Sequence, residues 1–211
     1  MLTFFTLIAC YLVGSIPTAL IAGFLYGKVD IRTTGSKNAG ATNLYRSFGL
    51  KLYIPVLCLD MFKGFVPVFW IAGFIDPEPL TYLQMQILCG IAAVIGHIFT
   101  IFAGFKGGKG VATAAGMMLA LIPGQLLLAL VVYLLVTSIT HYVSLGSISA
   151  AISLPIIFLL DNVLRGITYE WEIYAVSSVL ALLIIVTHRS NIGRLFRREE
   201  NKTYFFKSKS A

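Results

Sequence analysis

The sequence predicts an all-α integral membrane protein with seven transmembrane helices, an N-terminus outside and a cytoplasmic C-terminus. Three observations support this prediction. Of the 211 residues 58% are hydrophobic and only 12% are charged, about half the charged share of a soluble domain. Apolar runs recur along the chain, and most are long enough to cross a hydrocarbon core of about 30 Å. Lysine and arginine gather in alternate loops, as the positive-inside rule requires. We therefore expect a single transmembrane domain over residues 1–211.

The first three predicted spans cover residues 2–24, 52–74 and 80–102. The run Gly14-Ser15-Ile16-Pro17 interrupts the first span and predicts a kink or a close helix contact. Asp60 and Lys63 lie three residues apart inside the second span, and the simplest interpretation is that they pair with each other. A polar loop (26–50) and a short acidic turn (76–79) connect these spans.

Residues 111–140 run for 30 residues without a charge and form either one long kinked helix or two shorter helices. Charge favours two, divided at Pro123, with further spans at 143–160 and 173–187. Fourteen of the sixteen Lys and Arg residues then lie in cytoplasmic segments, the exceptions being Lys63 and Arg165. The segment 111–122 would rise only about 18 Å at ~1.5 Å per residue, so we expect a short, buried helix or a thinned bilayer there.

Composition also limits the function. The net charge of +7 follows from membrane topology, so we expect no nucleic-acid partner. Basic residues beyond Lys202 are expected to touch anionic lipid. Cys10, Cys58 and Cys89 are far apart and form no CxxC pair, which predicts neither disulfides nor zinc. Because no carboxylate cluster is present either, we expect no metal and no cofactor.

The stretch from Gly104 to Thr113 contains four glycines and two lysines. Glycines bring backbone N–H groups close to a ligand, and such groups at the start of a helix bind anions. This pattern predicts a phosphate cradle formed by Lys106, Gly107, Gly108, Lys109 and Gly110. It is not a Walker A loop, because the spacing is one residue short and no Ser or Thr follows the lysine. The alternative is a flexible positive loop that only orients the protein in the bilayer.

Two more polar segments fall on the same predicted side. Residues 35–46 are rich in small hydrogen-bonding side chains and end in Arg46, which can clamp a phosphate with two parallel bonds. Their alternative role is helix capping and turn formation. On a helix His188, Asn191 and Arg194 share one face, although basic residues commonly flank a last span.

Single residues near these segments leave alternatives open. His97 precedes the glycine loop and is either a catalytic group or a structural hydrogen-bonding residue. Ser144 and Ser147 begin the sixth predicted span and either cap it or contact ligand. The chain contains no GxSxG elbow and no His-x4-Asp pair. The three segments therefore predict an anion site without an obvious nucleophile.

At these segments the chain resembles the bacterial acyl-phosphate:glycerol-3-phosphate acyltransferases, a family of integral membrane enzymes. The resemblance covers nearly the whole chain. It rests on Gly35-Ser36-x-Asn38-x-Gly40-Ala41-Thr42-Asn43 with Arg46, on Gly96-His97-x-Phe99 followed by Phe105-Lys106-Gly107-Gly108-Lys109-Gly110-Val111-Ala112-Thr113, and on His188-Arg189-x-Asn191-Ile192-x-Arg194-Leu195. The chain departs from the family where it has Lys37 and Arg198 (usually Gly), Thr100 (usually Pro) and His141 (usually Arg).

The resemblance implies transfer of a fatty acyl group from acyl phosphate to the 1-hydroxyl of sn-glycerol 3-phosphate. The products are 1-acylglycerol 3-phosphate (lysophosphatidic acid) and phosphate. It implies a monomer in the bacterial cytoplasmic (inner) membrane, in contact with membrane lipid, with its active site facing the cytoplasm. The catalytic residues would be Lys109, His97 and His188. The substrate-binding residues would be Ser36, Asn38, Gly40, Thr42, Asn43, Arg46, Lys106, Gly107, Gly108, Gly110, Ser144, Arg189, Asn191 and Glu200.

Two other classes of protein fit part of the pattern. A membrane transporter for an organic phosphate also combines broken helices with a basic polar core. Its polar residues would not all gather at one face, and it commonly shows an internal repeat that is not visible here. A non-catalytic assembly factor would leave the phosphate-type segments without a purpose.

Overall fold

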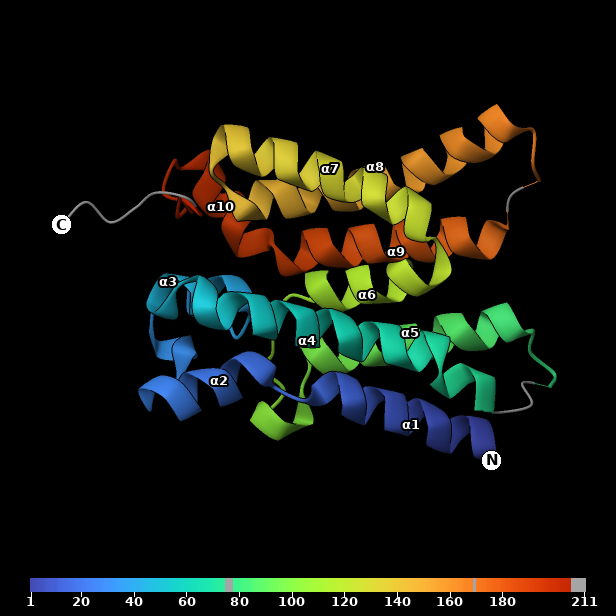
Figure 1. Cartoon of the computed structure of the whole chain (residues 1–211), viewed down its shortest axis with the longest axis horizontal. Coiled ribbons are helices and arrows are strands. Elements are labelled where there is room, and N and C mark those ends of the chain that lie inside the picture. The colour runs from blue at the N-terminus through green and yellow to red at the C-terminus, as the bar shows by residue number, and fades with distance from the viewer. Residues whose placement is uncertain (75–77, 169, 206–211) are drawn as a thin grey trace.

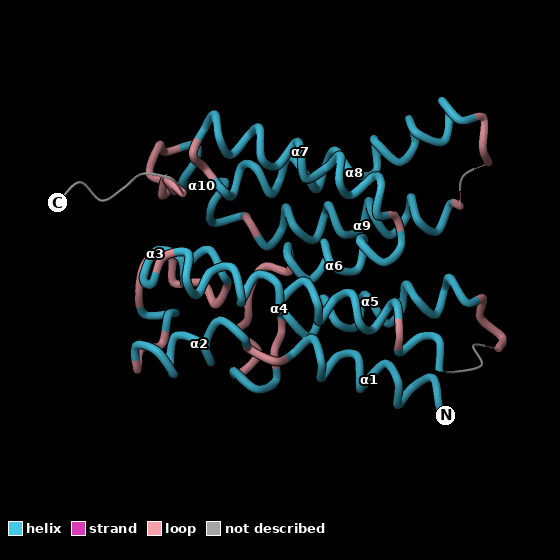
Figure 2. Tube along the Cα trace, viewed as in Figure 1, coloured by secondary structure: helices cyan, strands magenta, loops and turns pink. Residues whose placement is uncertain are grey.

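The structure, a computed structural model, describes residues 1–74, 78–168 and 170–205, and these residues are helical with no strand (Figure 1, Figure 2). The acidic-turn residues 76 and 77 and the tail residues Lys207 and Lys209 lie outside this described part. The helices are α1 (Leu2–Ser15), α2 (Thr18–Gly27), α3 (Ala41–Phe48), α4 (Leu50–Phe69), α5 (Tyr82–Ile98), α6 (Val111–Leu121), α7 (Pro123–Thr140), α8 (Val143–Arg165), α9 (Trp171–Thr187) and α10 (Arg189–Phe196), with short 3-10 turns at Ile31–Thr33, Ile71–Phe74 and Ile101–Ala103.

The helices form two layers with α6 between them (Figure 1). One layer contains α1, α4 and α5, and the other contains α7, α8 and α9. The main hydrophobic core surrounds α6, where Met117 and Met118 are almost fully buried against apolar residues of the neighbouring helices. The prediction of an all-α fold is confirmed.

The first predicted span is broken into α1 and α2 at Ile16 and Pro17. Proline has no N–H and cannot continue the helical hydrogen bonds. A Cβ atom on Gly14 would collide with the backbone of Ala93, so α1 packs directly on α5. The predicted kink and the predicted close contact are both present.

The segment 26–50, predicted as a polar loop, contains the helix α3. This helix begins after Gly40 and ends at Gly49, whose φ of 71° suits glycine. Its eight residues include few apolar side chains, of which Leu44 is fully buried. So short and polar a segment gives almost no periodic signal, which is why the sequence did not reveal the helix.

Residues 111–140 form two helices, as predicted. α7 starts at Pro123. At the first position of a helix a backbone N–H would have no partner within the helix, so proline costs no hydrogen bond there. α6 has only 11 residues, and α4 packs against its backbone. A Cβ atom on Gly64 of α4 or on Gly116 of α6 would collide with a carbonyl oxygen of the other helix. These two glycines therefore allow the short helix to lie in the centre of the bundle.

All seven predicted apolar segments are helical, but they differ in length. Within the described residues, five helical segments are long and apolar enough to cross a membrane: Leu2–Gly27, Leu50–Phe74, Tyr82–Ala103, Pro123–Thr140 and Val143–Arg165. α9 and α10 together, bent by 59°, would make a sixth, and α6 is shorter. α8 also runs past its predicted end at 160, with Arg165 Nε 2.7 Å from Asp161 Oδ1 one turn earlier.

Three departures from the family pattern have left-handed backbone angles. φ is +58° at Lys37, +61° at His141 and +60° at Arg198. For a residue with a Cβ atom this conformation costs roughly 1–2 kcal/mol, which explains why the resembled family carries Gly at the first and last of these positions. At the fourth departure the Thr100 hydroxyl donates to the Ser15 carbonyl at the end of α1.

We expect Lys37→Gly and Arg198→Gly each to raise the free energy of unfolding by about 0.5 kcal/mol, because relief of the left-handed strain exceeds the entropy cost of glycine. Thermal unfolding in detergent measures the effect. Lys51→Gly is the control: this lysine is the second residue of α4 and has no left-handed backbone angle, so glycine should lower stability, by at most about 1 kcal/mol. Equal destabilisation by all three substitutions would contradict the strain at Lys37 and Arg198.

Candidate active site

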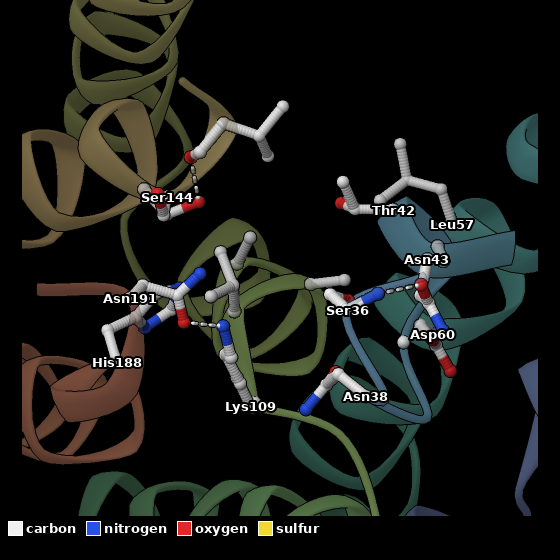
Figure 3. A pocket seen from close by; sticks show the side chains of 18 of the residues that line it. Ser36, Asn38, Thr42, Asn43, Leu57, Asp60, Lys109, Ser144, His188 and Asn191 are labelled. Atoms are coloured by element: carbon white, nitrogen blue, oxygen red, sulfur yellow. Dashed lines mark hydrogen bonds between the residues drawn. The ribbon is translucent and has the colours of Figure 1, made fainter. Parts of the chain in front are cut away.

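One cavity of about 190 Å³ brings the three predicted polar segments together, and Figure 3 shows labelled residues of all three around it. Lys109 lies between the α3 side of this cavity and the α10 side. Thirteen of the predicted site residues line it: Ser36, Asn38, Gly40, Thr42, Asn43, Arg46, His97, Lys109, Gly110, Ser144, His188, Asn191 and Glu200.

Four predicted site residues do not line this cavity. Lys106 and Arg189 are exposed. The N–H of Gly107 donates to Ile98 O at 3.0 Å, and that of Gly108 donates to His97 O at 3.1 Å. The prediction that these two amides cradle a phosphate is therefore wrong. They hold the glycine loop against the end of α5, and a Cβ on Gly108 would collide with the His97 ring.

Two helix N-termini open into the cavity. Gly40 and Thr42 at the start of α3 line it, as do Gly110 and Val111 at the start of α6. The first N–H groups of a helix have no partner within the helix, and the helix dipole adds positive potential there. The cavity thus has two helix N-termini suited to an anion.

A hydrogen-bonded chain fixes Lys109. Its ammonium donates to Asn191 Oδ1, and Asn191 Nδ2 donates to Glu200 Oε1 at 2.7 Å. The same carboxylate accepts from Ser144 Oγ at 3.0 Å and from Arg194 Nε at 2.7 Å. Glu200 is therefore fully engaged with protein groups. It was predicted as a substrate-binding residue, and in the structure it orients Asn191 and Ser144.

Burial lowers the pKa of Lys109 to about 8, and nearby Arg194 and Arg46 act in the same direction. The negative charge of Glu200 opposes this shift but does not cancel it. A lysine ordinarily titrates at about 10.4. Lys109 is therefore charged at neutral pH and loses its charge in mildly alkaline solution.

Arg46 reaches the cavity from α3. One guanidinium nitrogen of Arg46 donates to Asn201 O at 3.3 Å, and the Nε of Arg46 is buried without a hydrogen-bond partner. A buried donor without a partner costs free energy, so an anion in the cavity would supply the acceptor that Arg46 Nε lacks.

Neighbouring Asn43 has a different role. Its side chain bonds Ser36 N and Ile31 O, at 2.8 and 2.6 Å, and so holds the loop before α3.

The two predicted catalytic histidines differ in what surrounds them. His188 Nδ1 lies 2.8 Å from Ile184 O. A carbonyl oxygen only accepts, so Nδ1 carries the proton and Nε2 of the neutral ring can accept one. His97 is buried in α5, with Nδ1 3.7 Å from Asp60 Oδ1 and without a hydrogen bond.

Two features of the site were not predicted from the sequence. Asp60 lines the cavity beside His97, although the sequence indicated only its pairing with Lys63. The chain after Glu200 crosses near Arg46, and the Tyr45 hydroxyl donates to Tyr204 O at 2.8 Å. No local pattern marks either feature, because each joins residues far apart in the chain.

The apolar helices define an integral membrane protein, and its cavity combines cationic side chains with two helix N-termini, an arrangement suited to an anionic ligand. A family model described as glycerol-3-phosphate acyltransferase matches residues 4–198. The chain belongs to this family and is an acyltransferase.

Similar proteins cover nearly the whole chain. The glycerol-3-phosphate acyltransferase of Chlorobaculum tepidum is 41% identical, over 97% of this chain and 98% of its own length. That of Endomicrobium trichonymphae is 46% identical over 96% of each chain. The crystal structure of PlsY, an integral membrane glycerol 3-phosphate acyltransferase, in its glycerol 3-phosphate form has a TM-score of 0.85 and 36% identity, and covers 97% of this chain and 96% of its own. The lysophosphatidic acid form has a TM-score of 0.83, with 35% identity and 97% coverage of both chains.

Proposed function

We propose that the protein transfers a fatty acyl group from acyl phosphate to the 1-hydroxyl of sn-glycerol 3-phosphate. The products are 1-acylglycerol 3-phosphate and phosphate, and the reaction is the first acylation in phospholipid synthesis. Family membership supports this proposal, and so do the two structural neighbours, which were solved in glycerol 3-phosphate and lysophosphatidic acid forms.

The observation that carries the proposal is that two kinds of anion site line one cavity. Acceptor and donor each bring a phosphate, and the cavity offers both the N-termini of α3 and α6 and the cationic side chains Lys109 and Arg46. A single-phosphate ligand would need only half of this arrangement.

Residue roles follow from position. We assign glycerol 3-phosphate to Ser36, Arg46 and Lys109, with His188 and Asn191. The acyl phosphate would lie on the backbone N–H groups near Gly40, Thr42 and Gly110, with Ser144 beside them. Asn38 lines the same wall as Ser36 and has an amide that can donate to either phosphate.

The chemistry needs no further reactive group, because the donor is already activated. The acceptor oxygen attacks the carbonyl carbon, and the carbon–oxygen bond to phosphate breaks. The departing phosphate takes the hydroxyl proton and leaves as inorganic phosphate. Lys109 and the two helix starts stabilise the charge that develops on oxygen, and holding both substrates in place supplies much of the remaining acceleration.

His188 and His97 are the alternatives for the base. If His97→Gln and His188→Gln each lost more than about 10⁴-fold in kcat with KM unchanged, a loss beyond that usually attributed to a general base, the donor phosphate would not be the base.

The membrane arrangement is part of the proposal. Seven crossings, with the N-terminus outside and the C-terminus inside, place the cavity and fourteen of the sixteen Lys and Arg residues at the cytoplasmic face of a bacterial inner membrane. We propose that the protein is active as a monomer.

Purified protein in detergent tests the reaction directly. We expect phosphate release from acyl phosphate to require glycerol 3-phosphate and to match the lysophosphatidic acid formed. Acyl-CoA in place of acyl phosphate should give no product. Product from acyl-CoA alone would overturn the assigned donor, and no product from either donor would overturn the reaction.

The pKa of Lys109, about 8, predicts a pH dependence. Because a lysine with a lowered pKa loses its charge at lower pH, kcat/KM for glycerol 3-phosphate should fall above pH 8, by about tenfold per pH unit. Lys109→Arg keeps its charge to about pH 12, so its profile should be flat up to about pH 10. If kcat/KM of this variant fell above pH 8 as it does in the wild type, the fall would be due to the titration of another group.

A further inference from the structure

The chain that follows Glu200 returns to the candidate active site. Residues 201–205, here named the strap, follow a carboxylate that lines the cavity and is held by Ser144 and Asn191. α10 and α3 lie at the same end of the molecule (Figure 1). The strap thus starts from a fixed point at the cavity and reaches α3, from which Arg46 enters the same cavity.

One side of the strap binds the link between α7 and α8. The N–H of Thr203 donates to His141 O at 2.8 Å, and Thr203 is buried, at 3% exposed. The ring centres of Tyr204 and His141 lie 4.6 Å apart. The ammonium of Lys202 lies 5.7 Å from the centre of the Tyr142 ring, over its face. The strap is therefore attached to the α7–α8 layer beyond its starting point.

The other side of the strap binds α3 and α4. The ring centre of Phe205 lies 4.9 Å from that of Tyr45 and 5.5 Å from that of Tyr53, and aromatic pairs at such separations attract each other. The Tyr45 hydroxyl donates to Tyr204 O at 2.8 Å. Because Tyr45 directly precedes Arg46 in α3, the strap holds the helical turn from which Arg46 extends.

The strap also contacts the guanidinium group of Arg46. The Nη2 of Arg46 donates to Asn201 O at 3.3 Å and to Thr203 Oγ1 at 3.5 Å. The Nε of Arg46 is buried without a hydrogen-bond partner. The strap thus binds one nitrogen of the guanidinium and leaves another for a ligand. A phosphate that binds to Nε would meet a guanidinium whose orientation is already fixed.

Electrostatics explain why Arg46 needs this support. The positive charges of Lys109 and Arg194 repel it. The Glu200 carboxylate attracts Arg46 but is itself bonded to Arg194. An arginine side chain also has many rotamers, and holding one of them costs entropy. Repulsion and entropy both favour conformations in which Arg46 turns away from Lys109, and the oxygen atoms of the strap oppose this.

We propose that the strap is a positioning element, which holds Arg46 in the orientation that binds the phosphate of glycerol 3-phosphate. The proposal rests on the proposed function, which assigns this phosphate to Arg46. Thr203 and Phe205 act through Arg46, because neither is among the residues that line the cavity. Loss of their contacts weakens binding of the acceptor equally in the ground state and the transition state, which raises KM and leaves kcat unchanged.

Phe205→Ala tests the packing of the strap. Without the ring, the end of the strap loses its contacts with Tyr45 and Tyr53. We expect KM for glycerol 3-phosphate to rise by about tenfold, the usual effect of losing one hydrogen bond to a charged group. The values of kcat and of KM for acyl phosphate should change less than about twofold. Phe196→Ala is the matched control, because it removes the same ring from a side chain of α10 that is 86% exposed.

Thr203→Val tests the contact with Arg46. Valine has nearly the same size as threonine and keeps the backbone N–H that bonds to His141 O, so this variant tests the proposal even if Phe205→Ala does not fold. We expect KM for glycerol 3-phosphate to rise by about fivefold, and Thr203→Ser, which keeps the hydroxyl, to retain the wild-type value. In an Arg46→Lys background Thr203→Val should have no further effect, because lysine has no guanidinium to orient.

Calorimetric binding of glycerol 3-phosphate to the detergent-solubilised protein, without donor, gives a second measurement that does not depend on turnover. Weaker binding by Phe205→Ala and Thr203→Val, but not by Phe196→Ala or Thr203→Ser, would establish the role of the strap. Wild-type affinity in both strap variants, a fall in kcat at unchanged KM, or an undiminished effect in the Arg46→Lys background would overturn it. Strap-dependent binding without turnover of acyl phosphate would reject the donor in the proposed function and retain the strap.

Discussion

Lys109→Met is expected to lower kcat/KM for glycerol 3-phosphate by about 10²–10³-fold, the usual cost of losing one well-placed charge-stabilising donor. The lysine lies in the middle of the cavity and is held there by Asn191. Methionine has a similar length and no charge, so it removes the interaction without opening a large space. Initial rates of lysophosphatidic acid formation in detergent give the measurement.

Lys106→Met is the matched control, because Lys106 lies in the same glycine loop but is exposed and outside the cavity. We expect its rate to change less than about threefold, consistent with the small energies of exposed charges. Equal losses in the two variants would mean that the loop acts only through its overall charge. That result would favour the alternative interpretation, in which the loop only orients the protein in the bilayer.

Local sequence patterns predicted much of this molecule. Apolar runs located the helices, and Pro123 divided α6 from α7, because a missing N–H has the same consequence in any context. Motif resemblance located thirteen of the cavity residues. These features depend on residues close together in the chain or on the family pattern, so one sequence was enough to find them.

The remaining features depend on contacts between distant segments. Gly107 and Gly108 belong to a phosphate-type pattern, but the carbonyl groups at the end of α5 take their N–H groups. The resemblance placed Glu200 among the substrate-binding residues, but its carboxylate bonds to Ser144 and Asn191, 56 and nine residues away. Only the fold determines which polar group bonds to protein and which remains for ligand.

Asp60→Asn is expected to give the largest loss of stability among the variants discussed. Asp60 Oδ1 lies 2.8 Å from Lys63 Nζ, and both side chains are at most 6% exposed. The Lys63 ammonium also donates to Ile16 O at 2.8 Å, at the break between α1 and α2. Removing one charge of a buried pair leaves the other uncompensated, at a cost of about 3–5 kcal/mol. For a chain of this size that lowers the midpoint of thermal unfolding by about 10 °C.

The double variant Asp60→Asn with Lys63→Met separates charge from packing. It removes both charges, so we expect most of the lost stability to return. Asp161→Asn is the control, because it breaks an ion pair at the same 2.7–2.8 Å separation with an arginine that is 65% exposed, and exposed pairs contribute about 0–1 kcal/mol. A double variant as unstable as Asp60→Asn would show that the hydrogen bond to Ile16 O, and not the charge balance, holds the break between α1 and α2. The first span would then depend on Lys63 as a donor to the Ile16 carbonyl at the break.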